Sequence, residues 1–276
     1  MLLTALYQYL RKACDTVISA YDTLQQTPGD ADAVHQLRVG VKKLRAFFAL
    51  AKQLPDYSFG AGKHLHAARL IQAVGGASRD AHLQEKHLRL YEKKVAWRFS
   101  FAHLLLQKKH TTAIDLLQAT IQHTSLKKLE TLPERFSKAI EEMDKTAATE
   151  ALRQYLYRQH QEIILPAGSV HHAAWHEVRK QVKSLYYQLT ILAEVLPSTY
   201  TDTLTKHAGK AGELLGQWHD TSELSLFVGH TITQLRKEKI ALPEPVRQLQ
   251  LRLKADTKAQ LLQCSKQIKT LMEISY

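Results

Sequence analysis

Apolar residues recur three or four positions apart along most of this chain, which is the spacing of one face of an α-helix. Residues 2–26, for example, keep this spacing until the sequence TPGD interrupts it. Runs that alternate apolar and polar residues are short, and no Asn-Gly or Asp-Gly pair marks a β-hairpin turn. The pattern therefore predicts an all-α protein.

Segments that contain proline or glycine divide the chain into predicted helices. Asp30 or Asp32 is expected to cap the second helix, and the glycines of VGGAS (74–78) are expected to end the third. In the first half we expect helices at 2–26, about 30–53, about 58–74 and about 78–108, with one or two more within 110–145. In the second half we expect them at about 146–165, 170–196, 200–215, 217–239 and 244–273.

Polar positions repeat between the two halves of the chain. When the second half is aligned on the first, HQLRVGVKKL (35–44) falls on HEVRKQVKSL (176–185), and GGASRD (75–80) falls on LGQWHD (215–220). The halves are therefore predicted to be diverged copies of one helical unit. The identical pairs are His35 and His176, Arg38 and Arg179, Val41 and Val182, Lys42 and Lys183, Leu44 and Leu185, Gly76 and Gly216, and Asp80 and Asp220.

On a helical projection of about 100° per residue, both copies separate into an apolar face and a basic face. We call the basic face the cationic stripe: His35, Arg38, Lys42 and Arg45 in the first copy, and His176, Arg179 and Lys183 in the second. Residues 33–55 contain no acidic residue, although solvated helix surfaces usually mix charges of both signs. The stripe therefore predicts the wall of an anion-binding site.

Further basic residues are expected beside the cationic stripe, on the same helices or on the helices that pack against them. The repeated Asp80 and Asp220 are expected to cap the helix that follows or to hold a basic neighbour, since a carboxylate directed into an anion site would repel the ligand. If the two equivalent helices face each other, their stripes line one basic groove or pore. The additional basic residues are Lys43, Lys63, Arg69, Arg79, Lys180, Lys206, Lys210 and His219.

The overall charge agrees with an anionic ligand. Lysines and arginines number 38 and aspartates and glutamates 26, which gives a formal net charge of +12. Such an excess predicts a polyanionic partner: nucleic acid, a phosphate polymer or an anionic membrane surface. Protonation of His35 and His176 is expected to strengthen anion binding below about pH 7.

Several features bear on the location of the protein. No stretch reaches the roughly 20 apolar residues that a transmembrane helix needs, and the first residues lack the basic region of a signal peptide. Cys14 and Cys264 lie far apart and match no metal-binding spacing. We therefore expect a cytoplasmic protein with reduced thiols, no membrane insertion and no cofactor.

The stripe HQLRVGVKKLR, its second copy HEVRKQVKSLY and the turn GASRD resemble the CHAD family, the conserved histidine α-helical domain. The resemblance covers essentially the whole chain. It implies an all-α fold of two four-helix bundles related by pseudo-twofold symmetry, with inorganic polyphosphate bound in a basic central groove or pore. It also implies a location at polyphosphate granules. The stripe residues and the additional basic residues named above are then the polyphosphate contacts.

On this basis residues 1–276 form one CHAD-like domain, with a first helical half of about 1–145 and a second of about 146–276. Two positions depart from the pattern. Tyr186 replaces the final basic residue of the second stripe, and His219 stands where the first copy has Arg79. These departures predict that the two halves bind the ligand unequally.

Two other functions are alternatives to polyphosphate binding. A protein that binds single-stranded nucleic acid usually interleaves aromatic residues with cations for base stacking, and only the second copy has them, at Tyr186 and Tyr187. A polyphosphate or phosphate-ester hydrolase would need carboxylates that hold metal ions, but the sequence has no paired acids and no phosphate-binding loop. We therefore predict a binding protein that is not an enzyme.

A metal site and a membrane surface are the remaining alternatives. The cluster HHAAWH (171–176) places His172 and His176 four residues apart, a spacing that can bind zinc on a helix face. No third ligand stands at a usual spacing, so no metal site is predicted. Adhesion to an anionic membrane would need large apolar residues beside the cations, whereas the apolar face here lies opposite them.

Overall fold

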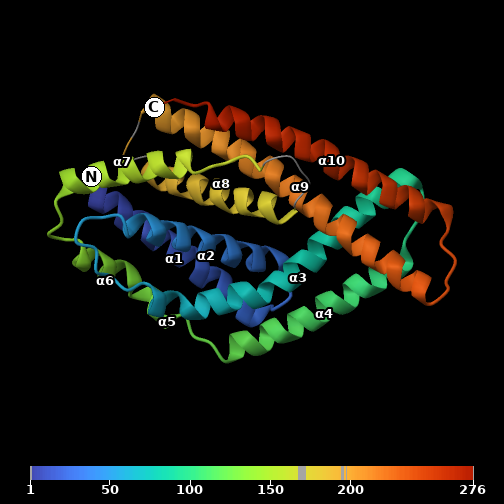
Figure 1. Ribbon diagram of the computed structural model, residues 1–276. Coiled ribbons are helices and arrows are strands. Elements are labelled where there is room, and N and C mark those ends of the chain that lie inside the picture. The colour runs from blue at the N-terminus through green and yellow to red at the C-terminus, as the bar shows by residue number, and fades with distance from the viewer. Residues whose placement is uncertain (1, 167–171, 194–195, 197, 276) are drawn as a thin grey trace.

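The structure is a computed structural model that describes residues 2–166, 172–193, 196 and 198–275 (Figure 1). These residues form helices, turns and loops without a β-strand, so the all-α prediction is confirmed. None of these described helices is long and apolar enough to cross a bilayer. In chain order they are α1 (Leu2–Gln26), α2 (Ala31–Ala51), α3 (Gly62–Val95), α4 (Ser100–Gln122), α5 (Lys127–Glu130), α6 (Leu132–Ala139), α7 (Lys145–Gln161), α8 (His172–Leu192), α9 (Thr199–Lys237) and α10 (Glu244–Met272).

The helices that carry the repeated polar residues meet in one region. α2 packs against α3, and α8 packs against α9. The two pairs are joined because α2 also contacts α8 and α3 contacts α9. Figure 1 shows α2 and α8 side by side in the middle of the molecule, with the long α3 and α9 beside them. α1, α4 and α10 pack on the outside of α2, α3 and α9, respectively.

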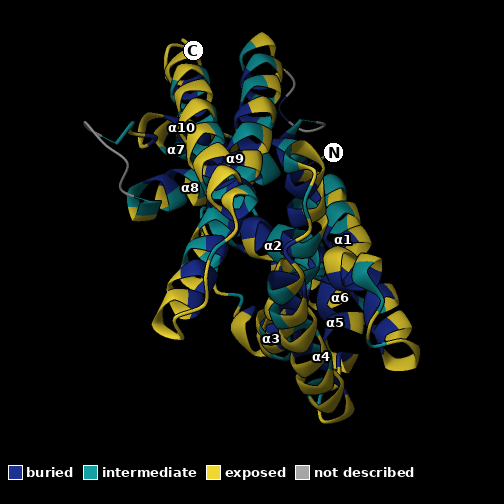
Figure 2. Ribbon diagram, turned by 90° about the vertical axis from the view of Figure 1, so that its right-hand side faces the viewer, coloured by how far each residue is buried: buried dark blue, intermediate teal, exposed yellow. Residues whose placement is uncertain are grey.

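Two hydrophobic cores hold the helices together. The larger one lies around α1, α2, α6 and α8 and includes the fully buried Phe47. The smaller one contains Leu88, Leu106, Val228 and Leu249, which come from α3, α4, α9 and α10. Figure 2 shows buried residues along the inner faces of the helices and exposed residues along their outer faces. α3 and α9 contribute residues to both cores.

The start of α2 sets the register of the cationic stripe. The Asp30 side chain accepts hydrogen bonds from the backbone N–H groups of Asp32 and Ala33, at 2.9 and 2.8 Å, so the cap predicted at Asp30 is confirmed. From this start, Leu37 and Val41 fall on the buried face of α2. The basic residues of the stripe fall on the other side of the helix, because their positions differ by half a turn.

The structure corrects the prediction that glycines end the third helix. α3 runs without interruption from Gly62 to Val95, and α9 runs from Thr199 to Lys237. α3 therefore replaces the helices predicted at about 58–74 and 78–108, and α9 replaces those predicted at 200–215 and 217–239. A glycine costs roughly 1 kcal/mol inside a helix, and packing against α2 and α4 outweighs this cost at Gly75 and Gly76, which are both buried.

The continuity of α3 and α9 also corrects the role expected of the repeated acids. Asp80 lies in the middle of α3 and Asp220 in the middle of α9. Neither residue therefore caps a helix.

The predicted helix at about 78–108 is wrong at its C-terminal end. α3 ends at Val95 and Ala96 adopts a left-handed backbone conformation, with φ of 49°. The buried Glu92 side chain accepts a hydrogen bond of 2.6 Å from the backbone N–H of Phe99 and lies 2.9 Å from Nε2 of His103 in α4. These tertiary contacts hold the turn between α3 and α4, and no proline or glycine marks it in the sequence.

Candidate anion-binding site

The cationic stripes of α2 and α8 come together at their centres. Burial lowers the pKa of Lys42 to about 8, and the next causes are the positive charges of Arg38, Arg179 and Lys183. Two of these three neighbours belong to α8, so residues from both stripes lie within electrostatic reach of one amine. We call Arg38, Lys42, Arg179 and Lys183 the four-cation cluster.

The cluster holds more positive than negative charge. Burial also lowers the pKa of Arg179 and of Lys183. Three carboxylates counter this effect. Asp220 raises the pKa of both Arg179 and Lys183, Asp80 raises that of Lys42 and Arg179, and Glu213 raises that of Lys183. A partly buried excess of cations is unfavourable, and a bound anion would relieve it.

Arg38 is fixed by the helix that lies next to it. Its Nη1 donates a hydrogen bond of 3.1 Å to the backbone carbonyl of Gln72, and its Nη2 lies 3.9 Å from Oδ1 of Asp80. The guanidinium passes directly over Gly76, where a Cβ atom would lie 2.6 Å from Nη1. Gly76 therefore makes room for Arg38 within a continuous helix. Asp80 forms an ion pair with Arg38, but the 3.9 Å separation is too long for the charge-assisted hydrogen bond that was expected.

The second half of the site is arranged differently. A Cβ atom built at Gly216 has no neighbour within 4 Å, so Arg179 does not lie over this glycine as Arg38 lies over Gly76. The buried Nε of Arg179 has no hydrogen-bond partner. A buried donor without a partner costs about 1–3 kcal/mol, and an anion oxygen would supply the missing acceptor.

Histidines form a row beside the cluster. The rings of His176 and His219 have centroids 5.3 Å apart, and those of His219 and His172 are 6.1 Å apart. Burial, followed by the charge of Arg179, lowers the pKa of His219 to about 3. Burial also lowers the pKa of His35 and of His176. These imidazoles are therefore neutral near pH 7 in the empty site, which does not favour the protonation expected for His35 and His176.

The remaining predicted residues lie outside the four-cation cluster. Arg79 lies near His35, since its charge lowers the pKa of that imidazole. Lys180 is exposed and pairs with Glu177 at 2.7 Å, next to His176 rather than in the cluster. Lys43 is half-buried on the side of α2. The exposed residues that are not among the main neighbours of the cluster are Arg45, Lys63, Arg69, Lys206 and Lys210.

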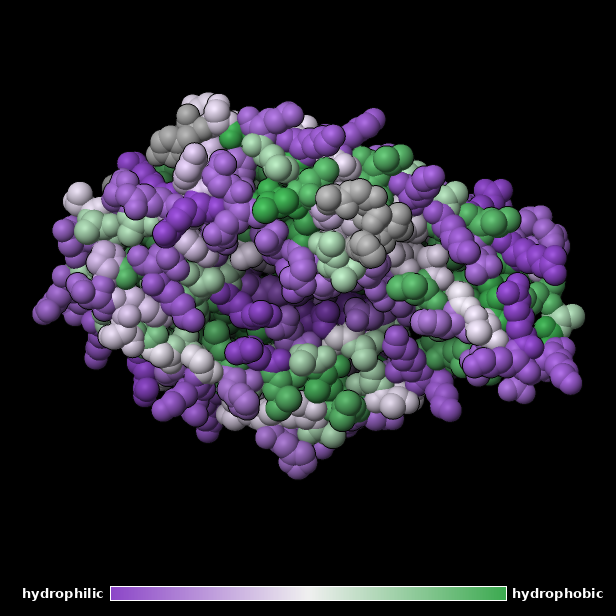
Figure 3. Space-filling model, in the orientation of Figure 1, coloured by the Kyte–Doolittle hydropathy of each residue, from purple (hydrophilic) through white to green (hydrophobic). Residues whose placement is uncertain are grey.

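The surface above these helices is hollowed. Figure 3 shows a depression lined by hydrophilic residues near the centre of the face seen in Figure 1. It lies over the region where α2 and α8 meet. The face of the molecule over the contact between α2 and α8 is therefore concave and hydrophilic.

The family of the protein follows from comparison with known proteins. Residues 8–228 match the family model of the CHAD domain. The chain belongs to the CHAD family. The resemblance seen in the stripe and turn motifs is thus confirmed, and the match includes every residue of the four-cation cluster.

Solved structures with the same fold extend over the whole CHAD chain. The crystal structure of the CHAD domain from the plant Ricinus communis is 17% identical, with a TM-score of 0.69, and the alignment covers 100% of this chain and 93% of that one. PptA from Streptomyces chartreusis is 15% identical, with a TM-score of 0.62, and covers 98% of both chains. No curated protein matches. At these identities the likeness shows the fold.

Three contacts at this site of the CHAD domain were not predicted from the sequence. Tyr187 lies beside Arg179, whose charge lowers its pKa against the raising effect of burial. His87 lies near Asp220, whose pKa it lowers while burial raises it. Gln72 provides the carbonyl that holds Arg38. His87 stands seven residues after Asp80, on the same face of α3, and this spacing was the available signal.

Proposed function

We propose that this CHAD domain binds inorganic polyphosphate at the four-cation cluster and catalyses no reaction on it. The observation that carries the proposal is the meeting of Arg38 and Lys42 of α2 with Arg179 and Lys183 of α8 in a partly buried excess of positive charge. The family has been linked to this ligand, as the resemblance implies. Binding would also place the protein at polyphosphate granules in the cytoplasm.

The chemistry of polyphosphate suits such a cluster. The polymer carries about one negative charge per phosphate and no bases, so recognition needs spaced cations and no base-specific contacts. Arg38 and Lys42 stand one helical turn apart, about 6 Å along the axis. Arginine offers paired donors to phosphate oxygens, while lysine acts as a compact charge.

The aromatic residues favour polyphosphate over single-stranded nucleic acid. Trp175 and Trp218 are 4% and 2% exposed and pack against each other, so neither offers a free face for a stacked base. Tyr187 is partly buried against Arg179. Binders of single strands instead expose aromatic rings along their basic groove.

The acids near the cluster favour binding without catalysis. Asp80 is engaged with Arg38 at 3.9 Å, and burial raises the pKa of Asp220. Hydrolysis of phosphate chains normally uses carboxylates that hold metal ions over the reacting phosphate. A hydrolase assay on long-chain polyphosphate, with divalent metal ions added, is expected to release no phosphate.

Calorimetric titration tests the binding proposal. The ligands are long-chain polyphosphate, single-stranded DNA of equal charge and triphosphate, each at two salt concentrations. The Arg38→Ala/Arg179→Ala variant removes two cluster charges, and Lys206→Ala/Lys210→Ala removes two exposed charges as a matched control. We expect the first variant to lose at least ~100-fold in polyphosphate affinity and the control about threefold or less.

The opposite pattern would refute the proposal. If both double variants lost affinity equally, the net charge of the whole surface would explain binding, and the cluster would have no special role. If DNA bound as tightly as polyphosphate at both salt concentrations, the site would be a general polyanion surface. Affinity for polyphosphate should fall steeply with salt in either case, because bound counterions are released.

A further inference from the structure

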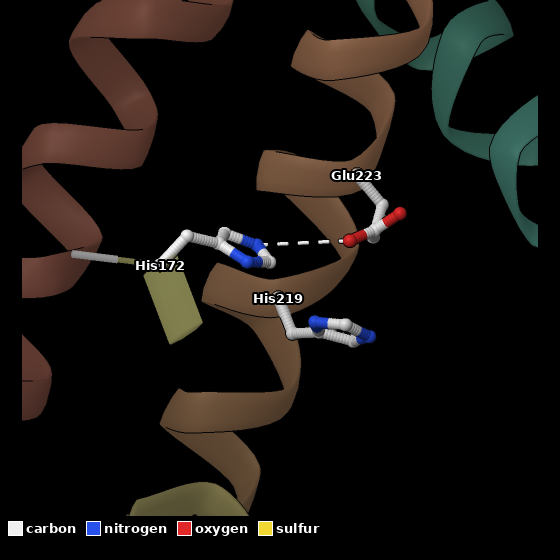
Figure 4. A group of neighbouring side chains, drawn as sticks. All are labelled: His172, His219 and Glu223. Atoms are coloured by element: carbon white, nitrogen blue, oxygen red, sulfur yellow. Dashed lines mark ion pairs between the residues drawn. The ribbon is translucent and has the colours of Figure 1, made fainter. Parts of the chain in front are cut away.

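A second group of polar side chains lies at the end of the histidine row. His172, His219 and Glu223 each offer one ligand atom, and these atoms lie within 4.8 Å of one another. Figure 4 shows the His172 ring reaching from α8 toward Glu223, with His219 beside it on α9. His219 and Glu223 are four residues apart on α9, so they share one face of that helix.

The nitrogens of this group are not used by the fold. His172 Nε2 and His219 Nδ1 are buried atoms without a hydrogen-bond partner. Nε2 of His172 lies 3.6 Å from Oε1 of Glu223, which is too far for a hydrogen bond. Buried imidazole nitrogens normally have a hydrogen-bond partner, and these two belong to residues whose ligand atoms lie within 4.8 Å of a ligand atom of Glu223.

We propose that His172, His219 and Glu223 bind a divalent transition-metal ion, for which zinc is the reference. Two imidazoles and one carboxylate form the protein ligand set of many open zinc sites. Zinc–ligand bonds of about 2.0–2.1 Å place the ligand atoms of a tetrahedron about 3.4 Å apart. The 3.6 Å between His172 Nε2 and Glu223 Oε1 is close to this distance.

The surroundings hold these ligands in place. The ring of His172 lies against Trp218, with centroids 5.1 Å apart, and Trp218 is almost fully buried. Magnesium and calcium prefer ligand sets made of oxygen, so two imidazoles select a transition metal. Three protein ligands leave a position open for water or an anion oxygen. The sequence predicted no metal site because no third ligand stands near His172 in the chain. In the structure, His219 and Glu223 come from another helix, α9.

Zinc titration of the metal-free protein tests this site without any phosphate ligand. Binding is followed by calorimetry with zinc chloride and by the visible absorption of bound Co²⁺. Glu223→Gln removes the anionic ligand while keeping the size of a half-exposed side chain, and His172→Ala removes one imidazole. His110→Ala is the control, because His82 and His110 form another histidine pair, with centroids 6.3 Å apart, that lacks a third ligand among the described residues.

We expect one equivalent of zinc to bind to the wild type and to His110→Ala. Glu223→Gln and His172→Ala are expected to lose at least ~10–100-fold in zinc affinity. Removing a residue that only hydrogen-bonds to a metal ligand already costs this much. Circular dichroism confirms that each variant is folded. Wild-type protein that binds no zinc, or Glu223→Gln that binds it as tightly as the wild type, would overturn the proposal and leave only an ion pair between His172 and Glu223.

Discussion

The guanidinium of Arg38 lies directly over the backbone of Gly76, and a Cβ atom at position 76 would stand 2.6 Å from its Nη1. We predict that Gly76→Ala displaces Arg38 and breaks its hydrogen bond to the Gln72 carbonyl. Polyphosphate affinity should fall roughly 10-fold. The free energy of unfolding should change by less than about 1 kcal/mol, because the gain in helix propensity offsets the lost contact. Titration calorimetry and urea denaturation measure the two quantities.

Gly216→Ala is the control for this substitution. A Cβ atom there meets nothing within 4 Å, and the glycine lies within α9. This variant should gain about 0.5–1 kcal/mol of stability and keep wild-type affinity. Equal losses of affinity in both variants would show that helix rigidity, and not the position of Arg38, controls binding.

Lys42 is predicted to destabilise the empty protein. Its pKa is about 8 in the folded state against 10.5 in the unfolded chain, so its charged form is disfavoured by folding. This penalty is fully present below pH 8 and is relieved as the pH rises from 8 to 10.5. Lys42→Met should therefore raise the free energy of unfolding by about 1–3 kcal/mol at pH 7. Urea denaturation at pH 7 and pH 10.5 should show a smaller difference at the higher pH.

Polyphosphate affinity is predicted to depend on the charge of the same amine. As the pH rises through about 8, Lys42 of the empty protein loses its proton, so binding must take up a proton and becomes weaker. Calorimetry between pH 7 and pH 9, in buffers of different ionisation enthalpy, measures both effects. Lys42→Arg stays charged over this range, and its affinity should be almost independent of pH. A wild-type affinity that is constant to pH 9 would contradict the prediction.

The turn between α3 and α4 is predicted to depend on Glu92. Its side chain accepts the 2.6 Å hydrogen bond from Phe99 and lies 2.9 Å from His103, and all three residues are buried. Glu92→Ala leaves two buried polar groups without their partner and should cost about 3 kcal/mol. Glu177→Ala removes an exposed ion pair and should cost less than about 1 kcal/mol. Thermal or urea denaturation of both variants provides the comparison.

The sequence predicted which residues of the site share a face of a single helix. The stripe on α2 follows from residue spacing, since side chains three and four positions apart share a helix face. Its repetition on α8 identified Arg179 and Lys183 as the matching cations. These residues do meet in the structure.

The basic residues that failed to reach the cluster show what spacing cannot reveal. Lys63 lies in the first turn of α3, and Arg38 crosses that helix at Gly76. Thirteen residues of helix separate the two positions by about 20 Å. Lys63 therefore lies far along α3 from the point where Arg38 crosses that helix. The point where two helices cross is set by tertiary packing, which the local pattern does not contain.

The proposed metal-ligand group could not be predicted from the sequence for a related reason. His172 and His176 drew attention because they stand four residues apart. The structure instead pairs His172 with Glu223 and places His219 beside them. Glu223 carries no local signal, since a single acid within a long helix is most often solvated. Only the packing of α8 on α9 brings these three residues together.

α3 and α9 enter both hydrophobic cores, with Leu65 and Leu204 in the larger one and Leu88 and Val228 in the smaller one. If either core unfolds, one end of α3 and one end of α9 lose their packing. The residues that contact the four-cation cluster, Gly76, Asp80 and Asp220, lie along the middle of these helices, between the ends that enter the two cores. Local unfolding of the smaller core would therefore also loosen the helices that carry the four-cation cluster's contacts. A destabilising substitution in that core is expected to act on the cluster from a distance.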